Sequence, residues 1–216
     1  MQAAVRTIRI ESALAALVTL WFLTILGASL GGAFYAGGGR PPVALLAAVA
    51  LPIAAFVGAY RTSVPFREFV LALDPRKLAL IHTTRVIGAV FLVLYLQGLL
   101  PGRFALPAGW GDVAAAAAAP LAVRALASGT AWGRRAFAAW NLFGLADFAV
   151  AVFMGAVVPI LMGAPASGAD AGIMRLFPLV LIPGFAVPFL IILHLISLAQ
   201  LRNRAGEGGA PNLPRS

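Results

Sequence analysis

Residues 176–201, LFPLVLIPGFAVPFLIILHLISLAQL, decide the fold, because this stretch contains no Asp, Glu, Lys or Arg. A helix needs about 20 predominantly apolar residues to cross the hydrocarbon core of a bilayer. The rest of the chain has a similar composition: 62% of its 216 residues are hydrophobic and 11% are charged. A typical soluble domain has about a quarter of its residues charged. The chain is therefore predicted to fold in a membrane.

Five further stretches carry almost no charge, so the sequence predicts an all-α, polytopic bundle of six transmembrane helices. The six predicted spans are 12–39, 41–60, 77–103, 113–133, 136–169 and 176–201. We expect residues 1–201 to form this single transmembrane domain. Residues 202–216 are rich in Gly, Pro, Asn and Arg, and this composition predicts a disordered cytoplasmic tail.

The segment between the second and third predicted spans has an amphipathic pattern. Phe66, Phe69, Val70 and Leu73 recur at the spacing of one helix face, which predicts a short helix lying in the membrane interface. Asp74 is followed by proline, a pair that is typical of a helix N-cap and first helical position. The third span is therefore expected to start here.

The basic residues predict the orientation of the chain. Eleven of its 16 Lys and Arg residues fall on the same side as the N-terminus, and three fall on the other side. Because basic residues concentrate on the cytoplasmic side, both termini are expected to be cytoplasmic. The expected partners are the lipid bilayer and, at the cytoplasmic Arg residues, anionic headgroups rather than nucleic acid. Gly27 and Gly31 form a GxxxG pair, which predicts close helix packing within the bundle or in a homo-oligomer.

Four ionisable residues within the predicted spans form the candidate site: His82, Arg85, Asp147 and His194. An ionisable side chain in hydrocarbon costs about 2.5–3.5 kcal/mol on insertion scales, so each one requires an explanation. At a rise of about 1.5 Å per residue, all four lie in the cytoplasmic half of the membrane or near its midplane. The sequence therefore predicts a single buried polar cluster.

Three functions are open for this cluster. The first is small-solute or proton handling, because Asp147 shares a helix face with small residues that leave space for a cavity. The second is a b-type haem protein for electron transfer, ligated by His82 and His194, the two histidines of the chain. The third is a structural ion pair between Arg85 and Asp147 in a scaffold or partner-binding protein. No catalytic residue, metal site or cofactor is predicted apart from haem b in the second alternative, and the absence of Cys removes thiolate chemistry.

Residues 109–112, GWGD, resemble the GxGD motif of intramembrane aspartyl proteases. Those enzymes require two carboxylates that share a proton. We expect Asp112 to cap the N-terminus of the fourth span at the outer membrane edge, about 20 Å from Asp147 along the membrane normal. This distance argues against a protease.

Three segments together resemble a group of uncharacterised small bacterial multi-pass membrane proteins. The segments are 104–112, 140–147 and 181–188, the last of which runs on to 194–198. The resemblance covers roughly the C-terminal two-thirds of the chain. It implies a protein of the bacterial plasma membrane, and it brings no assigned activity, cofactor or catalytic residue.

Overall fold

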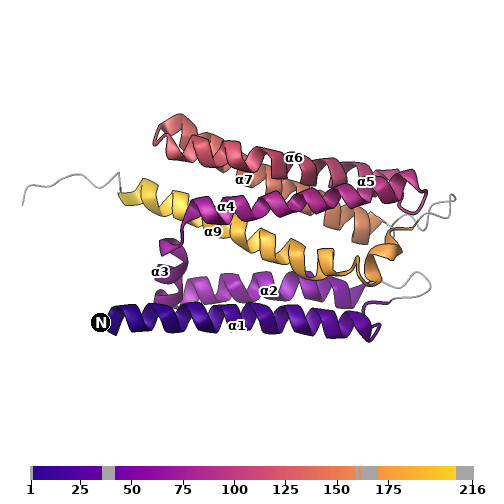
Figure 1. Cartoon of the computed structure of the whole chain (residues 1–216), viewed down its shortest axis with the longest axis horizontal. Helices are drawn as coiled ribbons and strands as arrows, with labels where there is room; N and C mark the ends of the chain where they lie inside the picture. Colours follow the sequence, from indigo (N-terminus) through magenta and orange to yellow (C-terminus); the bar gives the residue numbers. More distant parts are fainter. Residues whose placement is uncertain (1, 36–41, 159–160, 162–169, 208–216) are drawn as a thin grey trace, which may run out of the picture.

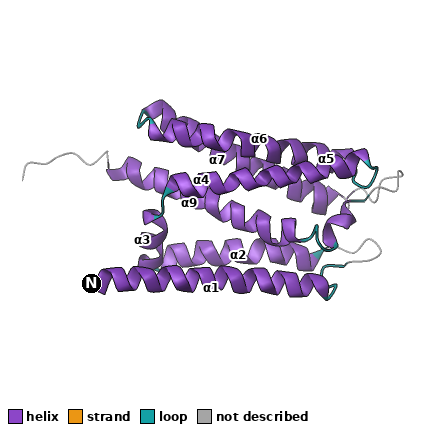
Figure 2. Cartoon of the chain, viewed as in Figure 1, coloured by secondary structure: helices purple, strands orange, loops and turns teal. Residues whose placement is uncertain are grey.

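The structure is a computed structural model that describes residues 2–35, 42–158, 161 and 170–207. Within these ranges the regular elements are all helices (Figure 2). Six segments are long and apolar enough to cross a membrane: Ser12–Leu30, Val43–Thr62, Pro75–Leu96, Gly102–Ala127, Ala131–Val157 and Ile182–Arg204. The chain is thus an all-α multi-pass membrane bundle, which confirms the predicted fold class.

Some of the spans are composed of several successive elements. In chain order the elements are α1 (Gln2–Leu30), α2 (Val43–Thr62), α3 (Val64–Ala72), α4 (Pro75–Ile81), η1 (His82–Gly88), α5 (Ala89–Leu96), α6 (Gly102–Ala127), α7 (Ala131–Val152), η2 (Phe153–Val157), η3 (Ala171–Arg175), η4 (Ile182–Ala186) and α9 (Val187–Glu207). The third span consists of α4, the 3₁₀ segment η1 and α5. The fifth is α7 followed by the π-helical segment η2, and the sixth is the π-helical segment η4 followed by α9.

The spans alternate in direction, so α1 starts and α9 ends at the same end of the bundle (Figure 1). We call this end the terminus side. Helix α3 lies there, across the direction of the spans, and the connection between α6 and α7 lies there too. The connection between α5 and α6 lies at the opposite side.

Spans three to six form the packed centre of the bundle. Helix α6 packs mainly against α7, η1 and α5, whereas α9 packs mainly against α7, α2 and η4. Helices α1 and α2 bury a smaller share of their residues than the other spans. The most extensive contact of α1 is with η4, where the Trp21 and Phe185 rings lie 4.7 Å apart. A Cβ on Gly27 would meet nothing within 4 Å, so Gly27 serves no close packing between the described helices.

The predicted short helix before the third span is present as α3. Ser63 caps its start by accepting a hydrogen bond from the Phe66 N–H at 3.4 Å. Its end is held by the buried Gln200 of α9, whose Nε2 donates to the carbonyls of Val70 at 3.0 Å and Leu73 at 2.8 Å. These contacts fix α3 to the last span. Asp74 caps α4 as predicted.

The largest departure from the predicted spans concerns the fourth helix. Its start was expected at residue 113 with Asp112 as the N-cap, but α6 starts at Gly102 after Pro101. Asp112 therefore lies inside the helix and is buried. A charged residue marks the end of a span only when it faces water, and Asp112 is instead neutralised inside the bundle. Membrane helices also tolerate an internal proline such as Pro107, because neighbouring groups satisfy the freed carbonyl.

The last helix is longer than predicted. Residues 202–207 were expected to belong to a disordered tail, but α9 continues to Glu207. Arg202 and Arg204 lie near its carboxyl end, where positive charge interacts favourably with the helix dipole. Residues 208–216 lie outside the described part of the chain.

This topology predicts which side chains a membrane-impermeant thiol reagent reaches. The chain has no cysteine, so a single introduced Cys gives a clean signal. The exposed positions Thr62 and Ser128 lie at the terminus side, and the exposed Gln97 lies at the opposite side. In oriented vesicles we expect Thr62→Cys and Ser128→Cys to react from one side and Gln97→Cys from the other. Reaction of all three variants from one side would contradict the fold.

Candidate functional site

The guanidinium of Arg85 is the centre of a buried polar cluster. Its Nε donates to Asp112 Oδ1 at 2.8 Å, its Nη2 donates to Asp147 Oδ2, and its Nη1 lies 3.2 Å from His194 Nε2. The ring of Phe148 covers one face of the guanidinium at 3.9 Å. Arg85 is 3% exposed, and each carboxylate residue is 8% exposed. We use the name Arg85 cluster for the set His82, Arg85, Asp112, Asn141, Asp147 and His194.

The local helix geometry brings His82 and Arg85 to one face of their helix, and four residues of the cluster to a similar depth. Residues three apart eclipse each other in a 3₁₀ helix, so η1 places His82 and Arg85 on one face. Four of the residues lie at least ten residues from either end of their own span: Arg85, Asp112, Asp147 and His194. Ten residues correspond to about 15 Å of α-helix, which places the four groups near the membrane centre.

Three glycines make room for the polar groups. A Cβ on Gly88 would come within 2.7 Å of the Asp112 carboxyl carbon, and one on Gly144 would come within 2.8 Å of Arg85 Nη1. Gly111 faces the Asp147 carboxylate in the same way. The cluster therefore fits only because each of these neighbouring positions lacks a side chain.

The hydrogen bonds determine the protonation of His194. A guanidinium can only donate, so His194 Nε2 accepts from Arg85. The proton of the neutral ring is then on Nδ1, which donates to Asn141 Oδ1 at 2.8 Å. Asn141 in turn donates from Nδ2 to the Phe137 carbonyl at 2.8 Å. His194 is thus a neutral imidazole held in one tautomer by partners on both nitrogens.

His82 is fully buried but has a different environment. Its ring stacks on His194 with 3.9 Å between centroids and meets Trp140 edge-on at 5.2 Å. Within the described part of the chain, neither of its ring nitrogens has a hydrogen-bond partner, and the same holds for the buried Ser197 Oγ. Buried polar atoms without a protein partner are usually satisfied by ordered water.

This geometry does not favour the haem alternative. The rings of His82 and His194 lie face to face at an interplanar angle of 28°, whereas two axial ligands must each direct a ring nitrogen at one iron. Both nitrogens of His194 are also engaged by protein partners. Haem ligation by this pair stays an untested prediction.

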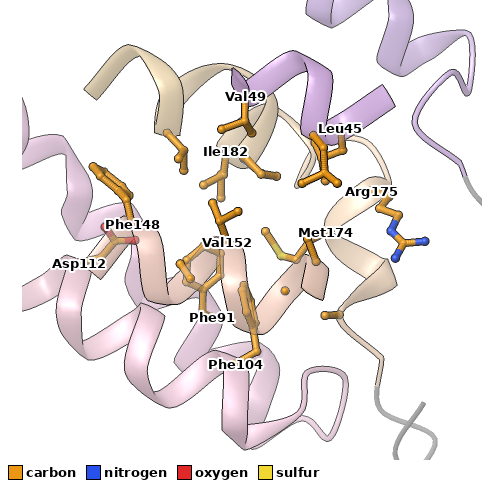
Figure 3. Close-up of a pocket in the computed structure, with 17 residues that line it drawn as sticks. Leu45, Val49, Phe91, Phe104, Asp112, Phe148, Val152, Met174, Arg175 and Ile182 are labelled. Carbon is orange, nitrogen blue, oxygen red and sulfur yellow. The ribbon is translucent and has the colours of Figure 1, made fainter. Parts of the chain in front are cut away.

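A cavity of about 60 Å³ extends from the Arg85 cluster towards the side opposite the termini. Asp112 and Phe148 lie at one end of it, and Met174 and Arg175 lie at the other (Figure 3). The lining residues are mainly apolar and come from the five helices α2, α5, α6, α7 and α9 and from the three short segments η2, η3 and η4. They are Leu45, Leu46, Val49, Phe91, Phe104, Asp112, Phe148, Ala151, Val152, Gly155, Ala156, Ala171, Met174, Arg175, Ile182, Pro183 and Val187. The cavity adjoins Ala151 and Gly155 of the small-residue face of the fifth span, but the carboxylate that lines it is Asp112 and not Asp147, beside which a cavity was expected.

The structure brings together all four residues of the predicted site, His82, Arg85, Asp147 and His194, and it adds Asp112. The expected separation of about 20 Å between the two aspartates is wrong, because both bond to the same guanidinium. Distance therefore no longer argues against an aspartyl pair. The arrangement still differs from a protease pair, because both carboxylates bond to the Arg85 guanidinium, whereas the two carboxylates of a protease share a proton. Residues 104–123 contain Asp112 as their single charged residue, so a fourth span predicted over this range would have identified Asp112 as a membrane-buried carboxylate.

We expect a methyl group at Gly144 to disrupt the cluster. Gly144→Ala should lower the free energy of unfolding by about 1–3 kcal/mol through overpacking against Arg85 and His194. The matched control is Gly58→Ala in α2, where a Cβ meets no atom of the described residues within 4 Å, and it should leave stability unchanged or slightly raised. Thermal unfolding in detergent measures both variants. Equal stability of the two would show that the cluster tolerates extra volume.

Comparison with known proteins identifies a family for most of the chain. No match was found among curated proteins or among solved structures. One family model matches residues 42–202, a range that contains the whole Arg85 cluster and leaves out α1. The chain therefore belongs to the family described as a domain of unknown function, DUF8737.

Proposed function

We propose that the Arg85 cluster binds and releases a proton, and that this exchange is linked to a small solute in the adjoining cavity. One observation carries the proposal: two buried carboxylates, Asp112 and Asp147, bond to a single guanidinium. Since His194 is neutral in this network, the cluster has a formal charge of minus one when both carboxylates are ionised.

An uncompensated charge at this depth is unfavourable. The effective penalty for a buried ion is several kcal/mol. A proton on one carboxyl removes the excess charge and leaves a neutral Arg–Asp pair. The cluster then stores one exchangeable proton.

The cavity gives this proton a path to one side of the bundle. Asp112 lines the cavity, whose far end is formed by η3. A water molecule needs about 10–15 Å³ of such space, so 60 Å³ accommodates several. Asp112 is therefore the group that exchanges protons with the cavity.

His82 supports a second path, towards the terminus side. It lies seven residues from the start of its span at Pro75, about 10 Å along the helix. Its ring contacts His194, and its nitrogens have no partner among the described residues. A neutral imidazole can accept a proton on one ring nitrogen while it donates the proton of the other.

The purely structural alternative uses the same contacts. An ion pair between Arg85 and Asp147 would join η1 to α7 without any chemistry. Such a lock needs only one carboxylate, however, and a second one adds buried charge. Asp112 is thus the residue that favours proton binding over a scaffold role.

The finer location of the protein is part of the proposal. We place it in a bacterial plasma membrane with both termini in the cytoplasm, in accordance with the positive-inside rule. In support, most described Lys and Arg residues outside the cluster lie near the terminus side, where they can meet anionic headgroups. Homo-oligomerisation through Gly27 and Gly31 stays a prediction, supported by the lack of any described atom within 4 Å of a Cβ built on Gly27.

Infrared spectroscopy tests for the stored proton. At neutral pH we expect the wild type to show the C=O stretch of one protonated carboxylic acid that shifts in D₂O. Asp112→Asn should remove this band and keep the fold, because one carboxylate still balances Arg85. Asp147→Asn should do the same.

The double variant provides the control. With both aspartates replaced by Asn, Arg85 has no counter-charge, and the free energy of unfolding should fall by about 3–5 kcal/mol. Absence of the carboxylic acid band in the wild type, or its persistence in both single variants, would contradict proton storage.

His82→Phe tests the path towards the terminus side. The substitution preserves an aromatic ring against His194 but cannot carry a proton. In proteoliposomes with an internal pH dye, we expect it to slow proton flux about tenfold or more, since a general acid–base group contributes about 10²–10⁴-fold to proton transfer. Thr83→Val, at an exposed neighbouring position, is the matched control. Equal flux in His82→Phe and the wild type would exclude His82 from the path.

A further inference from the structure

The cavity next to the Arg85 cluster combines a carboxylate with aromatic walls. Phe91 and Phe104 line it with ring centroids 5.5 Å apart and an interplanar angle of 56°. Phe148 lines it beside Asp112 (Figure 3). Aromatic faces attract cations, and their combination with a carboxylate is typical of sites for organic ammonium ions.

We propose that this cavity binds small alkylammonium ions at Asp112, and that the bound cation replaces the exchangeable proton of the Arg85 cluster. The inference rests on the proposed function for the proton, and it adds the chemical class of the solute.

The size of the cavity limits the ligand. At about 10–15 Å³ for each water-sized group, a cavity of about 60 Å³ accommodates roughly four to six non-hydrogen atoms. Trimethylammonium and tetramethylammonium are within this range. Larger ammonium ions with long or aromatic substituents are not.

The lining selects organic cations over inorganic ones. Ions such as Ca²⁺ and Mg²⁺ take about six or more oxygen ligands, and among the described residues that line the cavity Asp112 is the single carboxylate. The methyl groups of an alkylammonium ion, in contrast, fit against Phe91, Phe104 and Val152. Arg175 lies at the end of the cavity away from Asp112 (Figure 3), so the cation is expected at the Asp112 end.

The exchange conserves charge at the cluster. With the proton bound, the cluster is neutral. When the cation enters and the carboxyl releases its proton, the cation takes over as the compensating charge. One proton leaves for each monovalent cation that binds, so movement of the two in opposite directions is electroneutral.

Tetramethylammonium is the probe for this exchange, because it is permanently charged and carries no proton. We would add it to the purified full-length protein in weakly buffered detergent, and measure binding by calorimetry and proton release with a pH dye. We expect saturable binding with release of up to one proton per chain. tert-Butanol, a neutral molecule of the same size, should release none, and neither should Na⁺.

Three variants localise the binding. Asp112→Asn should weaken tetramethylammonium binding at least tenfold and abolish proton release. Phe104→Leu should weaken binding about two- to thirtyfold, the range for loss of a cation–π contact. Ala151→Leu fills the cavity without altering the cluster and should also abolish binding, whereas Ala54→Leu, at an exposed position of α2, should have no effect.

The outcomes separate this inference from the proposed function. A wild type that shows the carboxylic acid band but does not bind tetramethylammonium would overturn the alkylammonium site and leave proton storage standing. Binding that depends on Asp112 without proton release would support the site and overturn the exchange. Binding that survives in both Asp112→Asn and Ala151→Leu would place the cation elsewhere and overturn the inference.

Discussion

The arrangement of the central spans depends on one interaction, the bonding of the Arg85 guanidinium to two carboxylates and an imidazole. Its partners Asp112, Asp147 and His194 come from α6, α7 and α9. A single side chain thereby connects four of the six spans near their middle. In lipid there is little hydrophobic force between helices, so a polar contact of this kind has a large influence on how they are placed.

The second constraint is the close approach of the helices around that guanidinium. Gly88, Gly111 and Gly144 lie where a Cβ would collide with the polar side chains. Small residues at helix interfaces generally allow backbones to approach in membranes. Here the glycines provide room for ionisable groups, so the positions without side chains lie directly beside the charged side chains of the cluster. Helices α1 and α2, which are more exposed, contribute no side chain to the cluster.

The sequence alone predicted the fold class and most of the cluster, because both depend on composition and depth. Charge-free stretches identify spans, and an ionisable residue within one must have a partner, which was enough to bring Arg85, Asp147 and the two histidines together. Asp112 was misplaced because a neutralised carboxylate inside a helix looks the same in sequence as an N-cap at its start. Asn141 is uncharged, so the search for ionisable residues within spans did not include it. Its role as the hydrogen-bond acceptor for His194 Nδ1 follows only from the structure. The cavity depends on side-chain packing, which periodicity does not determine.

The 3₁₀ winding of η1 changes how the third span fits the thickness of the bilayer. A 3₁₀ helix rises about 2.0 Å per residue and an α-helix about 1.5 Å. The seven residues of His82–Gly88 are thus about 3.5 Å longer than the same residues in α-helical form, a gain equal to about two further α-helical residues. The span thereby gains reach across the hydrocarbon without additional apolar residues. The same tighter pitch aligns His82, Arg85 and Gly88 in one straight row, which keeps the imidazole, the guanidinium and the space for the Asp112 carboxylate in register along the membrane normal.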